Sequence, residues 1–431
     1  MKPDVFDIVI IGAGAAGLSA AKILSTAGRS ICICEARDRI GGRIHTLKGG
    51  EFSGPVEAGA EFIHGDLPLT KALMKQAKVS YYAGKGQTWT VEKNELARGD
   101  LFDDNWDILL TKLRQLEHDI TIGEFLKTFF NEPKYQSLVE GVTRFVQGYD
   151  AADVNKASAL ALREEWANEN IQGYRPIGGY SLLVEHLWSE VNHLHGVLKL
   201  STVINKIVWR NNYVEMYSDR NEKITARKVL VTVPVSVLKS GAIKFDPPLA
   251  QHQEALQQLE VGGVIKFLVE FKGPIWERRG PSKFNRMPAL NFLFSDAFIP
   301  TWWSQRPAEI PLLTGWLAGP VVQNLPQDDN VLLSQAISSL AYVFGCETAA
   351  LEKEIRAAKV FNWYVDPYAQ GAYAYKTLAT STAVRVLTRP LDNTIYFAGE
   401  ALYDGPEMGT VEAALASGNK AAEEIIREGF F

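Results

Sequence analysis

DIVIIGAGAAGLSAAKILSTAGRSICICEARDRIGGR, at residues 7–43, is the stretch that decides the fold of this chain. Its aliphatic start predicts a buried strand, and GAGAAG at residues 12–17 then opens a helix rich in alanine and leucine. A second apolar run, residues 30–34, ends at Glu35. The order strand, glycine turn, helix, strand and acid is typical of a βαβ unit that binds a dinucleotide.

Each part of this unit has a physical role in dinucleotide binding. Gly12 permits the tight turn, Gly14 lets a pyrophosphate approach the backbone, and Gly17 lets the helix pack close to the strand. The helix N-terminus presents its N–H groups and the positive end of its dipole to the phosphates. Glu35 is placed to accept hydrogen bonds from an adenosine ribose, and it would repel the 2′-phosphate of NADP. The choice between FAD and NAD stays open on these residues.

The composition argues against several classes of function. A chain of 431 residues is long enough for two domains, and 46% hydrophobic with 22% charged residues is ordinary for a soluble enzyme. The net charge of −5 argues against binding to nucleic acid or to an anionic membrane. No run approaches the ~20 apolar residues of a membrane span, and the first strand leaves no room for a signal peptide. We therefore expect a cytoplasmic protein.

The cysteines and histidines indicate neither a disulfide framework nor a metal site. Cys32 and Cys34 alternate on a predicted buried strand, and with Cys346 they are expected to be small hydrophobic residues in a reducing compartment. His193 and His195 have no cysteine or acidic cluster around them. We therefore predict that the chain binds no metal.

Three further segments carry polar residues in unusual places. GGR at residues 41–43 predicts a second tight turn with a cation that can meet a phosphate. PVEAGAEFIHG, residues 55–65, ends in His64, for which a core or loop position is an equally good interpretation. Lys266 interrupts the apolar run VIKFLVEF, residues 264–271, where an unpaired ammonium is costly to bury. The alternative is a lysine of an edge strand that reaches solvent.

In order and spacing, the glycine turn, EARDRIGGR at residues 35–43 and EAGAEFIHG at residues 57–65 resemble the flavin-containing amine oxidases. That family includes the monoamine and polyamine oxidases. The Gly-Gly-Arg element separates it from NAD dehydrogenases, so the resemblance implies FAD. Similar segments recur at the VIK run, at FNWYVDPYAQGAYAY (residues 361–375) and in the block at residues 394–426.

The resemblance implies a set of residues that contact FAD. They are Gly12, Gly14, Ala15, Ala16, Gly17, Glu35, Ala36, Arg37, Gly41, Gly42, Arg43, Gly59, Ala60, Glu61, Phe62, Val203, Thr232, Pro234, Trp363, Gly399, Glu400, Thr410 and Val411.

The resemblance also implies which residues act at the reacting end. Lys266 matches a catalytic lysine that is hydrogen-bonded through a water to flavin N5, and Tyr373 matches a tyrosine beside the isoalloxazine that forms one wall of an aromatic cage. Monoamine oxidases attach the flavin through a cysteine where this chain has Ala372, so the FAD is expected to be non-covalent. Thr410 replaces the second cage aromatic and is an expected substrate contact. His64 matches a histidine of animal polyamine oxidases and is the other expected substrate contact.

The implied fold is α/β, with a Rossmann-like FAD-binding domain and a substrate-binding domain made of a mixed sheet and helices. The FAD-binding domain is expected at residues 1–85, 175–260 and 392–431, and the substrate-binding domain at residues 86–174 and 261–391. Apolar residues at helical spacing, among them Ile108 and Phe129, predict helices between residues 104 and 170. The active site is expected between the two domains.

The implied reaction is FAD-dependent amine oxidation. A hydride equivalent passes from the substrate C–N bond to flavin N5, the imine hydrolyses to an aldehyde or ketone, and O2 is reduced to H2O2. The segments around His64 and Tyr373 favour a polyamine-like substrate over a simple monoamine. No nucleic acid or membrane partner is expected, and the sequence makes no prediction of oligomeric state.

Four alternatives within the same fold stay open, together with one non-catalytic alternative. A monoamine oxidase, an L-amino-acid oxidase, a desaturase and a porphyrinogen oxidase share the FAD motifs. Amino-acid oxidases carry an arginine for the substrate carboxylate where this chain has Glu61 and Phe62. A flavoprotein-fold escort protein without cofactor is disfavoured, because the glycine turn, Glu35 and Arg43 are intact.

Overall fold

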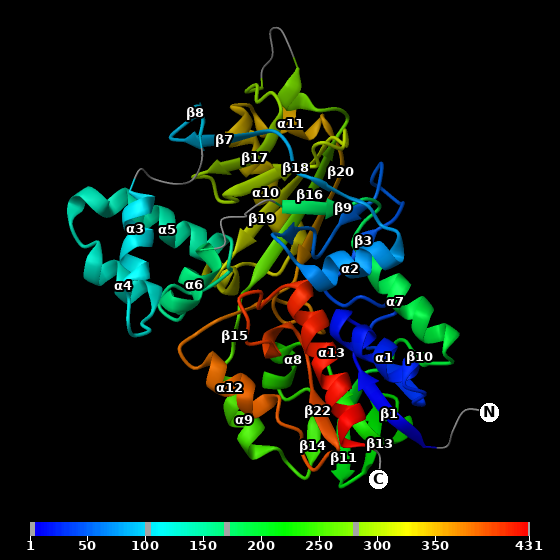
Figure 1. Cartoon of the computed structure of the whole chain (residues 1–431). Coiled ribbons are helices and arrows are strands. Elements are labelled where there is room, and N and C mark those ends of the chain that lie inside the picture. Colours follow the sequence, from blue (N-terminus) through cyan, green and yellow to red (C-terminus); the bar gives the residue numbers. More distant parts are fainter. Residues whose placement is uncertain (1–4, 100–104, 168–172, 279–283, 430–431) are drawn as a thin grey trace.

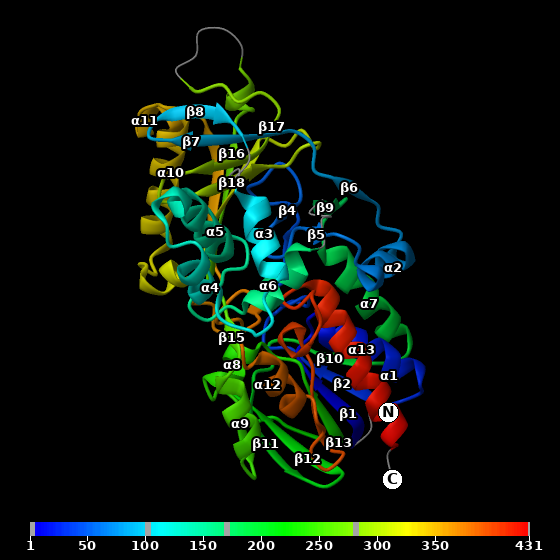
Figure 2. The ribbon, with the colours of Figure 1, turned by 60° about the vertical axis from the view of Figure 1, so that its left-hand side comes forward.

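Two large sheets stacked along the length of the molecule organise the chain (Figure 1). The computed structural model describes residues 5–99, 105–167, 173–278 and 284–429. Helices cover both sheets, and a separate group of helices lies at the level where the sheets meet (Figure 2). The predicted α/β class is confirmed by this architecture.

The first sheet is built around the predicted βαβ unit. Its order is β10-β2-β1-β13-β12-β11-β14, with β22 beside β13. Its strands are β1 Phe6–Ile11, β2 Ile31–Cys34, β10 Val197–Lys199, β11 Ile204–Arg210, β12 Tyr213–Ser218, β13 Lys223–Val231, β14 Lys244–Asp246 and β22 Ile395–Phe397. β1 runs parallel to β2 and β13, and β13 runs parallel to β22, so their C-terminal ends meet at one edge. A hairpin turn at Asn211 and Asn212 joins β11 to β12.

Helices sandwich this sheet. On one face lie α1 Ala15–Thr26, α2 Pro68–Ala77, α7 Ser181–His193 and α13 Val411–Glu428, and on the other lie α8 Val235–Lys239, α9 Ala250–Gln257 and α12 Thr380–Leu387. α1 and α13 pack backbone against backbone. A Cβ added at Gly418 of α13 would lie 2.2 Å from the carbonyl oxygen of Ala16, so only glycine allows this approach.

The second sheet has the order β20-β16-β19-β18-β17-β7-β8. Its strands are β7 Gln87–Glu92, β8 Glu95–Arg98, β16 Val264–Phe271, β17 Leu290–Ser295, β18 Thr301–Ser304, β19 Leu312–Ala318 and β20 Ile355–Asn362. α10 Asp329–Phe344 and α11 Thr348–Glu352 cover one of its faces, where a second apolar core forms. β16 lies between β20 and β19 and is buried at every position. The edge-strand alternative for Lys266 is therefore wrong.

Helices between residues 105 and 167 form a separate lobe with its own core. They are α3 Trp106–Arg114, α4 Ile122–Phe129, α5 Gln136–Gly148 and α6 Ala159–Trp166. The predicted helical segment is confirmed over this range, while its ends at residues 104 and 168–170 lie outside the described residues. Ile108 and Phe129 were expected on the apolar faces, yet both are exposed, because each lobe helix is only eight to thirteen residues long and buries a narrow stripe.

Short two- and three-stranded sheets join these parts. They are β3 Thr46–Leu47 with β4 Val56–Glu57, β5 Ile63–His64 and β6 Tyr81–Ala83 on either side of β9 Gly173–Pro176, and β15 Glu260–Val261 with β21 Ala374–Tyr375. The strands of each large sheet fall within the segments assigned to one predicted domain, while the domain boundaries themselves stay a prediction.

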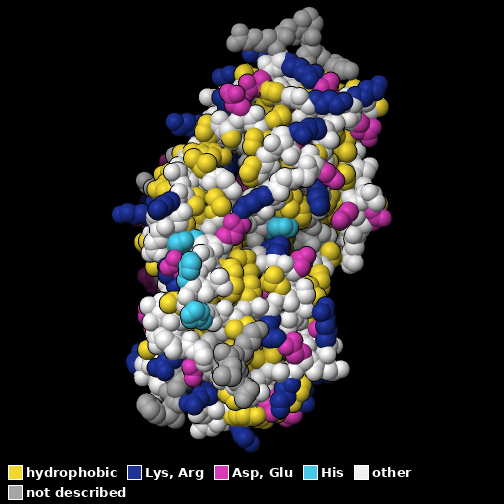
Figure 3. All heavy atoms as spheres, turned by 90° about the vertical axis from the view of Figure 1, so that its right-hand side faces the viewer, with side chains coloured by type: hydrophobic (Ala, Val, Ile, Leu, Met, Phe, Trp, Pro, Cys, Tyr) yellow, Lys and Arg dark blue, Asp and Glu magenta, His cyan; other side chains and the backbone are white. Residues whose placement is uncertain are grey.

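No helix within the described ranges combines the length and the apolar character needed to cross a bilayer. On the face shown in Figure 3, basic and acidic side chains are interspersed. The cytoplasmic location expected from the sequence stays a prediction.

Candidate active site

A cavity of about 1380 Å³ lies where the two large sheets and the helical lobe meet. Its walls come from the turn after β1, from β16, from the end of α5 with α6, and from the N-terminus of α13. All but one of the residues expected to contact FAD line it, together with the expected catalytic and substrate-contact residues. The roles of these residues stay predictions, but the chain does bring them together.

Gly17 is the residue of that set that does not line the cavity. A Cβ at this position would lie 2.1 Å from the carbonyl oxygen of Gly12, so Gly17 serves the close approach of α1 to β1. Gly12 itself has φ +110°, a conformation that favours glycine. The expectation that Gly17 touches the cofactor is thus replaced by a packing role.

Two glycine turns face each other at the nucleotide end of the cavity. Gly14 caps the N-terminus of α1, and a Cβ added there would have its nearest neighbour, the carbonyl oxygen of Gly41, only at 4.0 Å. Gly41 in turn donates its N–H to the carbonyl oxygen of Ala13 at 2.8 Å. The space beside Gly14 and the unpaired N–H groups of α1 form a cradle of the kind that holds a pyrophosphate. The site therefore fits a dinucleotide.

Glu35 holds this turn in shape. Its carboxylate accepts the backbone N–H of Ala13 at 2.7 Å and that of Arg37 at 2.9 Å, while the residue also lines the cavity. A carboxylate can accept further hydrogen bonds. Glu35 can thus fix the glycine turn and still accept a ribose hydroxyl.

The two arginines of the second turn are anchored to distant segments. Arg37 forms a bidentate ion pair with Asp366, at 2.5 and 3.0 Å. Arg43 donates through Nη1 to Glu400 at 2.7 Å and to the carbonyl oxygen of Ala372 at 2.5 Å. Arg43 was expected to meet a phosphate, and in the structure its first partners are these protein oxygens. It ties the glycine turn to the segments that hold the reacting end.

Lys266 is buried in the cavity wall and is paired with Glu61. Its ammonium donates to Glu61 Oε2 at 2.7 Å and to the carbonyl oxygen of Gly59 at 3.0 Å. Glu61 Oε1 accepts from Arg175 Nε and Trp303 Nε1, both at 2.8 Å. Burial alone raises the pKa of the Glu61 carboxyl, but Lys266 and Arg175 outweigh it and lower the pKa to about 2. Glu61 is therefore ionised.

Tyr373 stands opposite, against the helical lobe. Its ring is stacked on Trp316, with the centroids 6.5 Å apart, and its hydroxyl donates to the carbonyl oxygen of Tyr149. Trp316 Nε1 donates to the carbonyl oxygen of Gly148 at 2.7 Å. Burial, followed by the charge of Asp150, raises the pKa of the Tyr373 hydroxyl well above its usual value, so it stays protonated.

His64 lines the cavity as a neutral imidazole. Burial, followed by the charge of Arg175, lowers its pKa to about 4. Its ring packs on Phe62 and Tyr149, with the centroids 5.4 Å apart in both pairs. Within the described residues, the buried Nδ1 of His64 has no hydrogen-bond partner. The imidazole therefore lies in the cavity wall as an uncharged group.

Asp150 and Glu165 form a carboxyl pair that our sequence reasoning missed. Asp150 follows α5 and Glu165 lies on α6, and they share a hydrogen bond inside the cavity wall. Burial raises the pKa of Glu165 to about 7 and that of Asp150 well above its usual value. Aromatic residues of the same wall surround the pair, among them Tyr149 and Trp166. No motif marks these acids, because each looks in the sequence like an ordinary charge on a helix surface.

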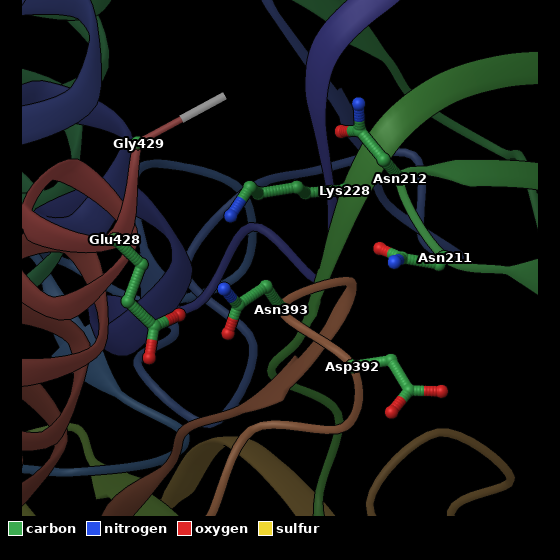
Figure 4. Close-up of a pocket in the computed structure, with 7 residues that line it drawn as sticks. All are labelled: Asn211, Asn212, Lys228, Asp392, Asn393, Glu428 and Gly429. Atoms are coloured by element: carbon green, nitrogen blue, oxygen red, sulfur yellow. The ribbon is translucent and has the colours of Figure 1, made fainter. Parts of the chain in front are cut away.

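A second, much smaller cavity of about 310 Å³ lies at the opposite edge of the first sheet (Figure 4). Its lining residues are Asn211, Asn212, Lys228, Asp392, Asn393, Glu428 and Gly429. Figure 4 shows Lys228 pointing toward Asn393 and Glu428, and its ammonium donates to the hydroxyl of Tyr396 at 3.0 Å. It shares no lining residue with the large cavity. The residues with expected chemistry all belong to the large one.

A family model described as flavin containing amine oxidoreductase matches residues 15–426. The chain belongs to this family. The expected resemblance is thereby confirmed, and the protein is a flavin-containing amine oxidoreductase with an α/β fold.

Curated relatives include two kinds of family member. Polyamine oxidase 2 of Arabidopsis thaliana is 27% identical over 98% of this chain and 89% of its own length. Lysine-specific histone demethylase 2 of Homo sapiens is 28% identical over 97% of this chain, which corresponds to 53% of the demethylase. The present chain thus spans most of the plant oxidase and about half of the human demethylase.

Solved structures agree on the fold. Wild-type putrescine oxidase bound to putrescine superposes with a TM-score of 0.79 at 19% identity, covering 98% of this chain and 99% of the oxidase. Cyclohexylamine oxidase from Brevibacterium oxydans IH-35A gives a TM-score of 0.80 at 19% identity, with the same coverage. The family member therefore has the architecture of these two amine oxidases.

Proposed function

We propose that this flavin-containing amine oxidoreductase is an FAD-dependent oxidase of diamines or polyamines. The observation that carries the proposal is the Asp150–Glu165 pair, placed in the cavity that also holds Lys266 and Tyr373. A second ammonium group on the substrate is the complement of such a pair, because a charge-assisted hydrogen bond to a buried carboxylate is strong. A simple monoamine has no second ammonium group with which to bind the pair.

The aromatic surroundings of the pair support the same substrate class. Tyr149 and Trp166 line the cavity beside the two acids. Aromatic faces attract cations, most strongly where the cation is partly desolvated. An alkyl chain with ammonium groups could therefore pack its methylenes and its charges along one wall.

The redox chemistry belongs to the cofactor, and the protein supplies binding, orientation and charge. FAD, when bound, accepts two electrons from the substrate C–N bond and passes them to O2. The two glycine turns and Glu35 would hold its nucleotide end without a covalent bond. The N-terminus of α13, capped by Thr410, favours negative charge beside the ring.

At the reacting end, the side chains orient the amine. Tyr373, protonated and fixed through Tyr149, presents a rigid aromatic wall. Neutral His64 offers a hydrogen bond to the substrate. Lys266 contributes an ammonium to the wall of the same cavity. Holding the reactants in one geometry is the main contribution that these groups can make.

A peroxide-coupled screen tests this function. The FAD-loaded protein is expected to release H2O2 with putrescine or spermidine at least ~10-fold faster than with alkyl monoamines, since one charge-assisted hydrogen bond is worth about 1.5–3 kcal/mol. Amino acids and a methylated-lysine peptide complete the panel, because the relatives include histone demethylases. A yellow protein without activity on any amine would contradict the proposal, and preference for another class would contradict the substrate.

Release of the flavin on denaturation tests the non-covalent linkage. Ala372 has no thiol with which to form the bond that monoamine oxidases make beside their tyrosine. Acid precipitation of the yellow protein is expected to leave the flavin absorbance in the supernatant, because the groups proposed to hold FAD offer it hydrogen bonds and a helix N-terminus without a covalent bond. The absorbance of pellet and supernatant is compared. Colour that stays in a washed pellet would contradict the prediction.

A further inference from the structure

We infer that Glu61 is a positioning residue that keeps Lys266 as an ammonium and directs it into the cavity. Our sequence reasoning placed Glu61 only among the residues that contact FAD. The inference rests on the proposed function in one respect, because it takes the cavity to hold FAD.

The hydrogen bonds of Lys266 leave one N–H for the cavity. An ammonium has three N–H donors. One donates to Glu61 Oε2 at 2.7 Å and one to the carbonyl oxygen of Gly59 at 3.0 Å. The residue is 1% exposed and lines the cavity, and its ammonium lies 5.6 Å from the centroid of the Trp303 ring. Beyond this aromatic face, the described residues give it no third nitrogen or oxygen acceptor, so the remaining N–H can donate to a molecule in the cavity.

Glu61 is itself held on several sides. Its Oε1 accepts from Arg175 Nε at 2.8 Å, from Trp303 Nε1 at 2.8 Å and from Gln305 Nε2 at 3.3 Å. These donors come from β9, from β18 and from the residue that follows β18. The carboxylate is therefore a fixed acceptor, and it fixes the direction of the lysine side chain that donates to it.

The charge balance explains why Lys266 depends on this carboxylate. Lys266, Arg175 and Glu61 form a buried cluster of two cations and one anion. A second buried carboxyl, that of Glu57, also interacts with Lys266, but burial raises its pKa to about 7, so it does not replace the full charge of Glu61. Without Glu61, the two cations would lose their shared direct partner, which is costly. Arginine does not lose its proton in proteins, whereas a buried lysine does so readily. Loss of the Glu61 charge is thus expected to leave Lys266 as a neutral amine.

A buried glutamate on the same strand as Lys266 provides a control. Glu270 lies on β16, four residues after Lys266, and is fully buried. It pairs with Arg356 at 2.9 Å and accepts the N–H of Ser53 at 2.9 Å. It does not line the large cavity. Its neutralisation tests the general cost of losing a buried carboxylate.

The experiment compares Glu61→Gln, Lys266→Met, the double variant and Glu270→Gln. The midpoint potential of bound FAD is measured by dye-coupled reduction, and the rate constant of the reduced protein with O2 is measured by stopped flow. Both Glu61→Gln and Lys266→Met are expected to lower the potential and to slow the O2 reaction at least ~10-fold, because each removes the ammonium N–H that Lys266 would offer to a bound flavin. Because that N–H can be lost only once, the double variant is expected to match Lys266→Met alone, as for residues that act as one unit. Glu270→Gln is expected to keep the wild-type potential.

Three outcomes would overturn the inference. They are a wild-type potential in Glu61→Gln, additive effects in the double variant, and an equal shift in Glu270→Gln. If Glu61→Gln does not fold, Glu61→Asp takes its place, with a potential between those of wild type and Lys266→Met expected and a wild-type potential overturning the inference. Amine turnover is scored separately. Expected potentials without amine oxidation would contradict the proposed substrate and uphold the role of Glu61.

Discussion

Gly14→Val is expected to give a folded protein whose affinity for FAD is at least ~100-fold weaker, a loss of about 2.7 kcal/mol. The backbone of Gly14 is extended, with φ −79° and ψ −176°, so valine fits its conformation. Its Cβ would meet no protein atom closer than 4.0 Å and would project into the space between the two glycine turns. The fold therefore tolerates the side chain, while a pyrophosphate does not.

The measurement is a titration of apoprotein with FAD, followed by flavin fluorescence, together with thermal unfolding of the apoprotein. Gly273→Val is the control, because a Cβ there meets no atom within 4 Å and the residue lies outside the cavity. It is expected to bind FAD as the wild type does. Wild-type affinity in Gly14→Val would show that the dinucleotide lies elsewhere.

The Asp150→Asn/Glu165→Gln double variant is expected to lose activity selectively on diamines. Removal of one charge-assisted hydrogen bond costs about 1.5–3 kcal/mol, so kcat/KM for putrescine should fall ~10- to 100-fold. The value for an alkyl monoamine should change less than ~3-fold, because that substrate has no second ammonium group to bind the pair. Glu164→Gln, an exposed neighbour on α6, is the control. An equal loss of kcat/KM on both substrates would contradict the proposal that the pair binds the second ammonium group of a diamine.

The pH dependence of this preference follows from the raised pKa of Glu165, which burial moves to about 7. A carboxyl with a raised pKa is neutral below that pH and charged above it. The ratio of kcat/KM for diamine over monoamine should therefore rise between pH 6 and pH 8. The reacting nitrogen of both substrates titrates in the same way, so its effect on kcat/KM cancels in this ratio. The rise should disappear in Glu165→Gln, and a ratio that is flat in the wild type would contradict the assignment.

Much of the cofactor end could be predicted from sequence because its chemistry is local. One βαβ unit contains the glycine turn, the start of the helix and the acid some twenty residues later. The local backbone geometry of the unit determines the position of each of them. Lys266 was recognisable for a similar reason, because a lysine inside an eight-residue apolar run contradicts the burial pattern around it. The role of Tyr373 could be predicted only from the resemblance to the family.

The electrostatic partners could not be predicted, because they are products of the tertiary fold. Glu61 and Lys266 are 205 residues apart, and no spacing rule joins them. Asp150 and Glu165 meet only because the segment that follows α5 packs against α6. Arg43 illustrates the converse case. Its position suggested a phosphate partner, but Glu400 and the carbonyl oxygen of Ala372 bind its guanidinium first.

The packing of α1 on α13 has a consequence for how the protein is made. Ala16 and Gly418 touch through their backbones, although 402 residues of chain separate them. The first βαβ unit leaves the ribosome early, whereas α13, which covers its outer face, is synthesised much later. Contacts of such long range form slowly, and a nascent chain exposes the uncovered apolar face of α1 meanwhile. The large cavity can therefore be completed only after α13 has been synthesised and has packed on α1.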